Sequence, residues 1–410
     1  MALNYRAYDG YFQDDEMENL AWAPLLPMTQ YLTAVLKPVF DVGNFRPPGH
    51  LYFTLIGRAF GMDFPPYITP IFAIHLANAI LLFLLLRKLA VSRWCALGGV
   101  AFFALSATAM DAYWKPMYVF DLLCTTFSLA SILLFAYRRW ILSFIAFWLA
   151  YKSKELAVML PVVLLAYEYW LGERRYAVLV PFFVAALSFG LQGLLLNPNK
   201  NNEYTFRFGL NSLWKTIPFY SRRLFFIPFS GLALLALGWI RDRRVWFGLA
   251  AMLSFLFVLL FLPGRLFEAY AYLPLACAAI AIAAAAERAG PRWLWIALLV
   301  WLPWNVRELH REQRAILDAD DDAAAYVDQL QAWAGRHPAT TTLIYNVPPR
   351  GYHHWGVTGA WNIGHHGLGF LAYFHDRPEA AEAMSKETVA LATWDSASRK
   401  LDIEIHPPPK

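Results

Sequence analysis

Three consecutive carboxylates near the start of the chain are the residues best suited to chemistry. Asp14, Asp15 and Glu16 stand just ahead of apolar sequence, and Asp9 and Glu18 lie close by. Neighbouring carboxylates raise one another's pKa, and partial burial adds to this effect. Such a group can act as a general base or bind a divalent metal ion. The alternative is a solvated acidic turn without a chemical role.

Two basic segments could hold an anion. Arg46 opens an Arg-Pro-Pro-Gly-His stretch that ends at His50, and a guanidinium can bind a phosphate through two parallel hydrogen bonds. Lys152, Lys154 and Glu155 lie between two apolar runs, where charges are costly unless they face a polar cavity. The simpler interpretations are an interfacial arginine among lipid headgroups and an outer loop with snorkelling lysines.

Histidines are concentrated in the last part of the chain. The cluster consists of His353, His354, His365, His366 and His375. No cysteine or carboxylate stands at a spacing that would complete a closed zinc site. A histidine-rich surface loop is therefore the preferred interpretation, and a metal site is the alternative.

The composition indicates that these groups belong to a membrane protein. Hydrophobic residues make up 59% of the 410 residues and charged residues only 16%, whereas a soluble domain is about 25% charged. The 17 Trp and 21 Tyr suit membrane interfaces. The net charge of +5 is better explained by cytoplasmic anchors than by nucleic acid, which is not an expected partner. Cys95, Cys124 and Cys277 lie far apart in or beside apolar runs, so no disulfide framework is indicated.

Ten apolar runs approach the length of a membrane span, which is about 20 residues, with a range of roughly 17–25. The runs are residues 67–87, 96–112, 118–137, 140–151, 155–171, 176–196, 224–240, 246–262, 268–286 and 292–305. The runs 140–151 and 292–305 are short, and a tilted or half-buried segment is the alternative for both.

The links between these runs alternate in charge. Every second link is rich in basic residues: Arg87, Lys88 and Arg93; Arg138 and Arg139; Arg174 and Arg175; Arg241, Arg243 and Arg244; Arg288 and Arg292. The positive-inside rule assigns this set to the cytoplasm. The other links and both termini then share the extracytoplasmic face, together with Asp111, Lys115, Asp121, Arg222, Arg223, Arg265 and Glu268. Cations beside carboxylates would suit a substrate that has a phosphate to hold and a hydroxyl to activate.

An extracytoplasmic start of the chain is unexpected. Residues 1–66 contain no export signal and are too interrupted by proline and charge to span a membrane. We therefore expect an apolar helix of about 20 residues upstream of Met1. The alternative is that a short acidic terminus crosses the membrane unaided.

The patterns divide the chain into three parts. Residues 1–66 are predicted to be an extracytoplasmic acidic loop, with interfacial helices at 28–40 and 50–60. Residues 67–305 are the transmembrane helical bundle. Residues 306–410 are a small soluble extracytoplasmic α+β domain, with a charged helix over 306–336 and strand-like sequence at Thr341–Val347 and Lys400–His406. The predicted fold class is thus an all-α polytopic membrane protein of about ten membrane segments with a C-terminal soluble domain.

Several of these segments, in this order, resemble the GT-C membrane glycosyltransferases, in the branch of the protein O-mannosyltransferases and the bacterial lipid-A aminoarabinose transferases. The stretch Gln13-Asp14-Asp15-Glu16 stands where that family carries an acidic pair in its first outer loop. Phe45-Arg46-Pro47 is similar to the family's Tyr-Arg-Pro segment, and Lys152-Ser153-Lys154-Glu155 looks like its Ser-Lys-Glu or Lys-Gly-Pro element. Glu268-Ala269-Tyr270-Ala271-Tyr272-Leu273-Pro274 resembles its Glu-Arg-Tyr-Leu-Tyr-Leu-Pro segment.

The resemblance covers about residues 10–290 and has two departures. Ala269 stands where the family has arginine, so a phosphate contact is lost or Arg265 supplies it. The helix that precedes the acidic loop in the family has no counterpart in this sequence.

The resemblance implies an enzyme of the bacterial inner membrane that works on the periplasmic face. It would move a sugar from a polyprenyl-phosphate carrier to a protein, lipid or glycan acceptor. Asp14 or Asp15 would deprotonate the acceptor hydroxyl, which attacks the anomeric carbon with inversion, and Asp14 is our preference. The residues expected to hold the donor phosphate are Arg46, Lys152, Lys154, Arg222, Arg223 and Arg265. Further site candidates are Glu16, His50, Lys115, Asp121, Glu155, Glu268 and Tyr270; a divalent metal is the one cofactor considered.

Two other classes of function stay open. A transporter or flippase for a lipid-linked sugar would use the same charges to line a path, but transporters place polar residues near the bilayer midplane. Here most charges collect at the ends of the apolar runs, which favours an enzyme. A non-catalytic assembly subunit is the third class, and loss of activity on substitution of Asp14 or Asp15 with normal membrane insertion would exclude it.

Overall fold

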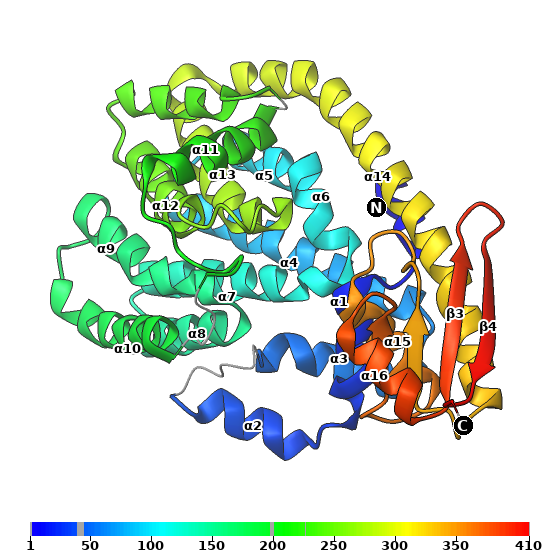
Figure 1. The fold of residues 1–410 in the computed structure, drawn as a ribbon. Coiled ribbons are helices and arrows are strands. Elements are labelled where there is room, and N and C mark those ends of the chain that lie inside the picture. Colours follow the sequence, from blue (N-terminus) through cyan, green and yellow to red (C-terminus); the bar gives the residue numbers. More distant parts are fainter. Residues whose placement is uncertain (1, 39–44, 197–200, 226, 410) are drawn as a thin grey trace.

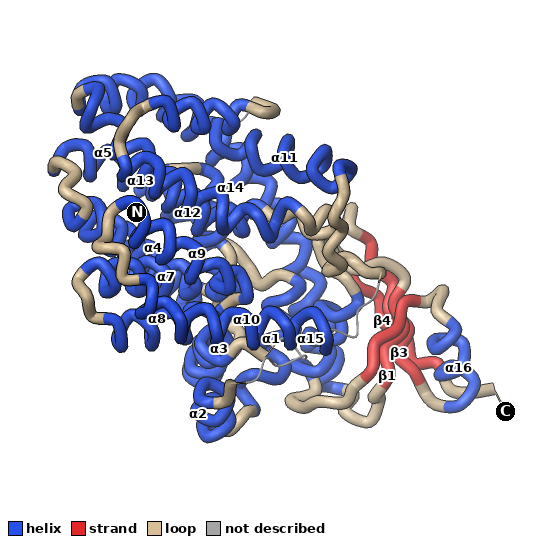
Figure 2. The backbone as a smooth tube through the Cα atoms, turned by 90° about the vertical axis from the view of Figure 1, so that its left-hand side faces the viewer, coloured by secondary structure: helices blue, strands red, loops and turns tan. Residues whose placement is uncertain are grey.

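The computed structural model describes residues 2–38, 45–196, 201–225 and 227–409. Helices form most of the molecule, and a small sheet lies at one end of it (Figures 1 and 2). The N-terminal part comprises η1 (Ala2–Asp9), α1 (Asp14–Trp22), η2 (Ala23–Leu25), α2 (Met28–Leu36) and α3 (Pro47–Phe60). The helices α2 and α3 correspond to the two predicted interfacial helices, although residues 39–40 lie outside the described residues.

The helical bundle follows the apolar runs of the sequence. Its elements are α4 (Pro65–Lys88), α5 (Arg93–Leu105), α6 (Ala107–Trp114), η3 (Pro116–Tyr118), α7 (Val119–Ala136), α8 (Trp140–Ser153), η4 (Glu155–Met159), α9 (Leu160–Trp170), η5 (Tyr176–Leu179), α10 (Val180–Leu196), α11 (Leu210–Phe225), η6 (Ser230–Trp239), α12 (Arg243–Leu260), η7 (Glu268–Ala271) and α13 (Tyr272–Ala289). Residue 226, in the predicted segment 224–240, and residues 197–200, in the link before it, lie outside the described residues.

By length and composition, five helices of the described chain could cross a membrane alone. They are Pro65–Lys88, Pro116–Ala136, Tyr176–Gly193, Arg243–Leu260 and Glu268–Ala289. A sixth crossing results if the bent pair α5 and α6 counts as one span. The predicted number of about ten is not confirmed, because α8, α9 and η6 have only 14, 11 and 10 residues, fewer than the roughly 17 that a lone span needs. The long apolar helices are compatible with an integral membrane protein.

The Arg-rich links contact one another at one end of the bundle. Asp242 binds Arg244 of its own link at 2.7 Å and Arg288 of another link at 3.0 Å. Arg244 also donates to the carbonyl of Ala90, in a third link, at 2.9 Å. Further contacts within this set join Lys88 with Tyr137, Glu173 with Arg138 and Arg175, and Trp170 with Trp246. The links that alternate in the sequence therefore gather on one face in space.

The helix α13 is enclosed by its neighbours over nearly its whole length. Every residue from Tyr272 to Ala286 except Ile282 is buried. An added Cβ at Gly248 of α12 would stand 2.5 Å from the backbone nitrogen of Ala281. Small residues let membrane helices approach this closely, and the tight packing fixes the position of η7, which begins α13.

A bend of 58° separates α5 from α6 at Ser106. Asn305 satisfies the backbone groups that the bend releases. Its side-chain oxygen accepts from the Ala107 amide at 2.8 Å, and its side-chain nitrogen donates to the Leu105 carbonyl at 2.5 Å. Because an unsatisfied backbone group in lipid costs several kcal/mol, this contact explains a fully buried asparagine and fixes α6 in place.

The helix α14 (Pro291–Arg336) connects the bundle with the sheet as one continuous helix of 46 residues. Its apolar first part lies along the bundle, and its charged remainder runs down to the strands (Figure 1). The predicted boundary between bundle and soluble domain, at residue 305, falls inside this helix. The charged helix predicted over 306–336 is its second part.

The C-terminal part contains β1 (Thr342–Tyr345), α15 (His354–Gly364), β2 (Leu371–Phe374), α16 (Pro378–Lys386), β3 (Val389–Asp395) and β4 (Lys400–His406). The strand order is β2-β1-β3-β4, with β1 parallel to both neighbours and β3 antiparallel to β4. The predicted strands at Thr341–Val347 and Lys400–His406 are confirmed. The predicted α+β class is wrong in one respect, because parallel strands joined through α15 and α16 follow the α/β pattern.

Candidate functional site

The acidic residues form the first turn of a helix and are not part of a loop. Asp14, Asp15 and Glu16 begin α1, where the positive end of the helix dipole favours carboxylates. The backbone amide of Gln13 donates to Glu16 Oε2 at 2.6 Å, as in a capping box. This ordered start gives each of the three carboxylates a different direction and a different environment.

Asp14 is held by the C-terminal part of the chain. Its Oδ1 accepts from the backbone amides of His353 and Gly356 at 2.9 and 3.0 Å, and its Oδ2 is hydrogen-bonded to His353 Nδ1 at 2.6 Å. His353 precedes the first turn of α15, so the Asp14 carboxylate fills the anion-binding end of that helix. Burial raises the pKa of Asp14, while the hydrogen bonds from His353 act in the opposite direction. The contacts make Asp14 the link between α1 and α15.

Two glycines let α15 lie directly against α1, as Figures 1 and 2 show. An added Cβ at Gly356 would stand 2.3 Å from Asp14 Oδ1, and one at Gly359 would stand 2.7 Å from the backbone of Met17. Both positions are buried. The close approach therefore depends on the absence of side chains at these two positions.

Asp15 has the more open carboxylate of the pair. Trp355 Nε1 donates to its Oδ1 at 2.7 Å, and no hydrogen bond to its Oδ2 is found within the described residues. Asp15 is half-buried, whereas Asp14 is buried. The Trp355 ring stacks on His353 with centroids 4.4 Å apart, so one aromatic pair holds both carboxylates.

Glu16 has a structural environment. It is 1% exposed, and its two oxygens accept from the backbone amides of Gln13 and Met117 at 2.6 and 2.8 Å. Burial raises its pKa to about 8. These contacts tie α1 to η3 of the bundle and leave Glu16 little room for a substrate.

Lys154 and Asp121 form a buried ion pair in the bundle. Lys154 Nζ lies 2.6 and 2.5 Å from the two oxygens of Asp121. It also lies 4.0 Å from the centre of the Tyr270 ring, a cation–π distance. Three predicted site residues from α7, the end of α8 and η7 thus meet at one point.

Arg46 is paired in the same manner with Glu155. Its Nε and one terminal nitrogen donate to the two Glu155 oxygens at 2.9 and 3.1 Å. Burial lowers the pKa of the Arg46 guanidinium, but Glu155, followed by Tyr270 and Asp121, more than offsets this and raises it. Glu155 follows Lys154 in the chain, and the Arg46 guanidinium lies 5.5 Å from the ring of Phe120, which precedes Asp121, so the two ion pairs are neighbours.

His50 supports Arg46 and is not a candidate acid or base. Its Nδ1 accepts from the Arg46 backbone amide at 2.9 Å, and its ring stacks on Phe45 at 5.3 Å. Burial, followed by the charge of Arg46, lowers the pKa of His50 to about 3. The ring is therefore neutral at physiological pH.

The side chain of Arg265 has only long polar contacts among the described residues. One terminal nitrogen lies 3.4 Å from the Tyr270 hydroxyl and the other lies 3.4 Å from the exposed Glu203. Its guanidinium lies 4.4 Å from the Tyr204 ring and 4.5 Å from the Phe267 ring. Its Nε is buried and has no hydrogen-bond partner in the described part of the chain. An unsatisfied buried donor is costly, and the Nε of Arg223 is buried without a described partner in the same way.

Tyr204 lies within electrostatic reach of both halves of the site. Burial raises its pKa, and the charges that act on it include Arg265, Arg46 and Asp15. The three cations Arg46, Lys154 and Arg265, together with Tyr270, form what we call the cationic cluster. The charges of this cluster and of Asp15 both act on Tyr204.

The remaining predicted residues lie elsewhere. Arg223 pairs with Glu268, and with Glu312 of α14 at 3.6 Å. Lys115 pairs with Asp111 at 2.9 Å. Lys152 donates to the Lys37 carbonyl at the end of α2 and lies over the rings of Trp148 and Phe189, and Arg222 is exposed with no ion pair among the described residues. The structure thus links Arg46, Lys154 and Arg265 by contacts but gives Lys152, Arg222 and Arg223 other surroundings.

The structure offers no multi-ligand metal site in the residues it describes. No group of three or more His, Cys, Asp or Glu side chains there could hold an ion. Of the five clustered histidines, His353 binds Asp14 and His365 stacks on Phe370.

Sequence reasoning missed the residues that hold the acidic pair. Trp355, Gly356 and Gly359 were not singled out, and His353 was considered only as a metal ligand. Two glycines three positions apart beside a tryptophan are a weak signal of close helix packing, but nothing in the sequence names the partner helix.

Comparisons with protein-family models, with curated proteins and with solved structures found no match.

Proposed function

We propose that this protein is a GT-C-type glycosyltransferase that moves a sugar from a polyprenyl-phosphate carrier to an acceptor. Two features support the proposal: the cationic cluster and the open carboxylate of Asp15, whose charges both act on Tyr204. Arg265 offers a buried Nε without a described partner, and Asp15 offers a carboxylate oxygen without one. The phosphate of a lipid-linked sugar could accept a hydrogen bond from Arg265, and the hydroxyl of an acceptor could donate one to Asp15.

In the proposed reaction, Asp15 takes the proton of the acceptor hydroxyl. The acceptor oxygen forms the new bond to the anomeric carbon, with inversion. The bond from that carbon to the phosphate oxygen breaks, and the polyprenyl phosphate leaves with its added charge beside Arg265 and the cationic cluster. Electrostatic stabilisation of this kind, in a partly dry site, is usually the largest catalytic contribution.

The roles differ from the sequence-based expectation in two ways. The preference for Asp14 as the base is not supported by its contacts, because both of its oxygens are bound by His353 and Gly356. Arg46 and Lys154 are already neutralised by carboxylates, so Arg265 is the better candidate for the direct phosphate contact. This choice fits the departure at Ala269, since Arg265 lies beside Tyr270 in the same segment.

The proposed location is the bacterial inner membrane, with the site on the periplasmic face. The support is that the Arg-rich links gather at one end of the bundle, whereas Asp15 and the cationic cluster come from the other set of links. A cysteine at the exposed position Ser398 should react with a membrane-impermeant thiol reagent added to intact spheroplasts. Protection until the membrane is permeabilised would reverse the proposed orientation.

The direct test is a donor screen with purified protein. Polyprenyl-phosphate-linked hexoses and pentoses are supplied, and release of free polyprenyl phosphate is measured. Arg265→Gln should raise the apparent KM for the donor by roughly tenfold or more, since hydrogen bonds to charged groups contribute about 1.5–3 kcal/mol. The exposed Arg222→Gln is the matched control and should leave KM unchanged. Absence of polyprenyl phosphate release from every donor would reject the proposal.

The alternative function, transport of a lipid-linked sugar, has one observation in its favour. His75 and Asn78, well inside α4, are hydrogen-bonded to the Tyr272 hydroxyl at 2.7 and 3.3 Å. Polar groups inside a span often mark a transport path or a proton relay. Movement of an intact lipid-linked sugar across proteoliposomes, without release of polyprenyl phosphate, would favour this alternative.

A further inference from the structure

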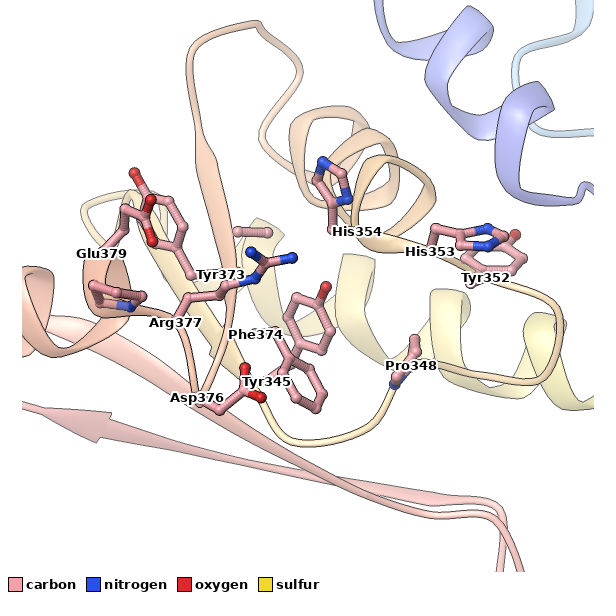
Figure 3. Close-up of a pocket in the computed structure, with 12 residues that line it drawn as sticks. Tyr345, Pro348, Tyr352, His353, His354, Tyr373, Phe374, Asp376, Arg377 and Glu379 are labelled. Atoms are coloured by element: carbon pink, nitrogen blue, oxygen red, sulfur yellow. The ribbon is translucent and has the colours of Figure 1, made fainter. Parts of the chain in front are cut away.

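A pocket of about 940 Å³ opens in the C-terminal part of the chain, outside the site described above. Its floor is formed where β1 and β2 end, at Tyr345 and Phe374, and the first residues of α15 and α16 form its sides (Figure 3). Ligands of open sheets with parallel strands bind at the carboxyl ends of those strands. The volume lies in the range of small-molecule sites.

The lining combines aromatic rings with exposed charges of both signs. Tyr345, Tyr373 and Phe374 supply the rings. Asp376, Arg377 and Glu379 project from the turn before α16 and its first residues, and Figure 3 shows Arg377 extending between Tyr373 and the rings of the floor. None of these three charged side chains has an ion pair within the described residues. Their polar atoms are therefore free to bind a ligand.

The balance of charge selects among ligand classes. One arginine faces two carboxylates, so the pocket has no excess positive charge to favour a phosphate or another anion. The carboxylates can only accept hydrogen bonds and the guanidinium can only donate them. A saccharide has hydroxyls that do both, and it has flat C–H faces that pack on aromatic rings. Its chemistry matches this lining better than that of an anion or a purely apolar ligand.

The pocket is coupled to the acidic pair through one residue. His353 lines the pocket, its Nδ1 is bound to Asp14, and its ring stacks on Trp355, which donates to Asp15. A ligand that fills the pocket therefore contacts His353, which binds Asp14 directly and reaches the proposed base Asp15 through the stacked ring of Trp355.

We propose that this pocket binds the saccharide part of the acceptor, so that the acceptor of the reaction is a glycan. The assignment deepens the proposed glycosyl transfer and rests on it. An oligosaccharide seated between α15 and α16 would extend past His353 and Trp355 and present a hydroxyl to Asp15.

The first measurement concerns binding alone and needs no donor. The full chain in detergent is applied to an array of tri- and tetrasaccharides built from glucose, galactose, mannose and N-acetylglucosamine, and the strongest ligand is titrated calorimetrically. Asp376→Asn and Arg377→Gln should each raise its Kd by about tenfold or more. The matched controls Asp402→Asn and Arg399→Gln change exposed residues of the same domain outside the pocket and should leave Kd unchanged. No saccharide binding, or binding that survives both pocket substitutions, overturns the inference.

The second measurement concerns the acceptor role and uses the enzyme with its donor. Polyprenyl phosphate release should be stimulated by the bound saccharide, and Asp376→Asn should raise the KM for that saccharide while the KM for the donor stays constant. Stimulation by an unglycosylated peptide, with no effect of the pocket substitutions, overturns the inference but leaves glycosyl transfer standing. Conversely, saccharide binding at the pocket without polyprenyl phosphate release from any donor supports the pocket and rejects the proposed function.

Discussion

Substitution of the two neighbouring aspartates should separate stability from catalysis. Asp14→Asn removes the charge from a carboxylate that accepts two backbone amides of α15 and binds His353. Hydrogen bonds to charged groups contribute about 1.5–3 kcal/mol each, and the amide keeps part of them. We expect a loss of about 1.5–3 kcal/mol in the free energy of unfolding, with measurable turnover remaining.

Asp15→Asn should have the opposite effect. Its one described side-chain bond, from Trp355 Nε1 to Oδ1, can be kept by the asparagine carbonyl, so the change in stability should be small. Loss of the proton acceptor should lower kcat by roughly 10²- to 10⁴-fold, the usual contribution of general-base catalysis.

The assay combines thermal unfolding in detergent with polyprenyl phosphate release from the best donor, both measured on the same preparations. If Asp14→Asn abolishes turnover at an unchanged melting temperature while Asp15→Asn stays active, the assignment of the base is reversed. Equal and mild effects of both substitutions would mean that neither carboxylate contacts the acceptor. The hypothesis that one of these aspartates is the catalytic base would then be rejected.

Three further predictions follow from the geometry. Arg46→Ala and Lys154→Ala should raise the KM for the lipid donor more than that for the acceptor, but by less than Arg265→Gln does, because both cations are already held in ion pairs; the control Arg222→Ala should not, and an unchanged donor KM would remove both cations from the phosphate site. Burial raises the pKa of Glu16 to about 8 from its ordinary value of 4.5, so the folded state takes up a proton before the unfolded state does as the pH falls, and stability should rise from pH 8 to pH 5. Glu16→Gln should make the melting temperature depend less on pH. The same pH dependence in the native protein and in the variant would contradict a raised pKa of Glu16. Gly359→Ala should lower the melting temperature and the activity together, because the added Cβ would stand 2.7 Å from the α1 backbone; a silent substitution would show that α15 need not touch α1.

The membrane character and the arrangement of the links could be read from the chain alone. The apolar runs predicted long apolar helices, and the alternation of the basic links from Arg87 to Arg292 predicted that these links share one face. The contact of Asp242 with Arg288 agrees with that assignment. The number of membrane crossings could not be predicted from the apolar runs. The helices α8 and η6 show that such a run can form a helix that is too short to cross alone.

The helix predicted at 50–60 corresponds to α3, but its start at Pro47 and the helix α1 were not predicted. Pro47 and Pro48 mark the start of α3, and Asp14, Asp15 and Glu16 mark the start of α1 in the structure. The sequence was interpreted there as a loop, because a run of carboxylates fits a solvated turn and the first turn of a helix equally well.

The chain by itself determined which residue types were available for chemistry: carboxylates near the start, and cations in the turns that follow. Only the tertiary structure decided which of them are free. Asp14 meets His353 across 339 positions of sequence, and Arg46 meets Glu155 across 109. Periodicity and charge pattern describe the surroundings of one segment, whereas the pairing of distant side chains depends on how whole helices pack. As the helices pack, Asp14 is bound by His353 and Gly356, and Arg46 is neutralised by Glu155. One oxygen of Asp15 and the Nε of Arg265 have no hydrogen-bond partner among the described residues.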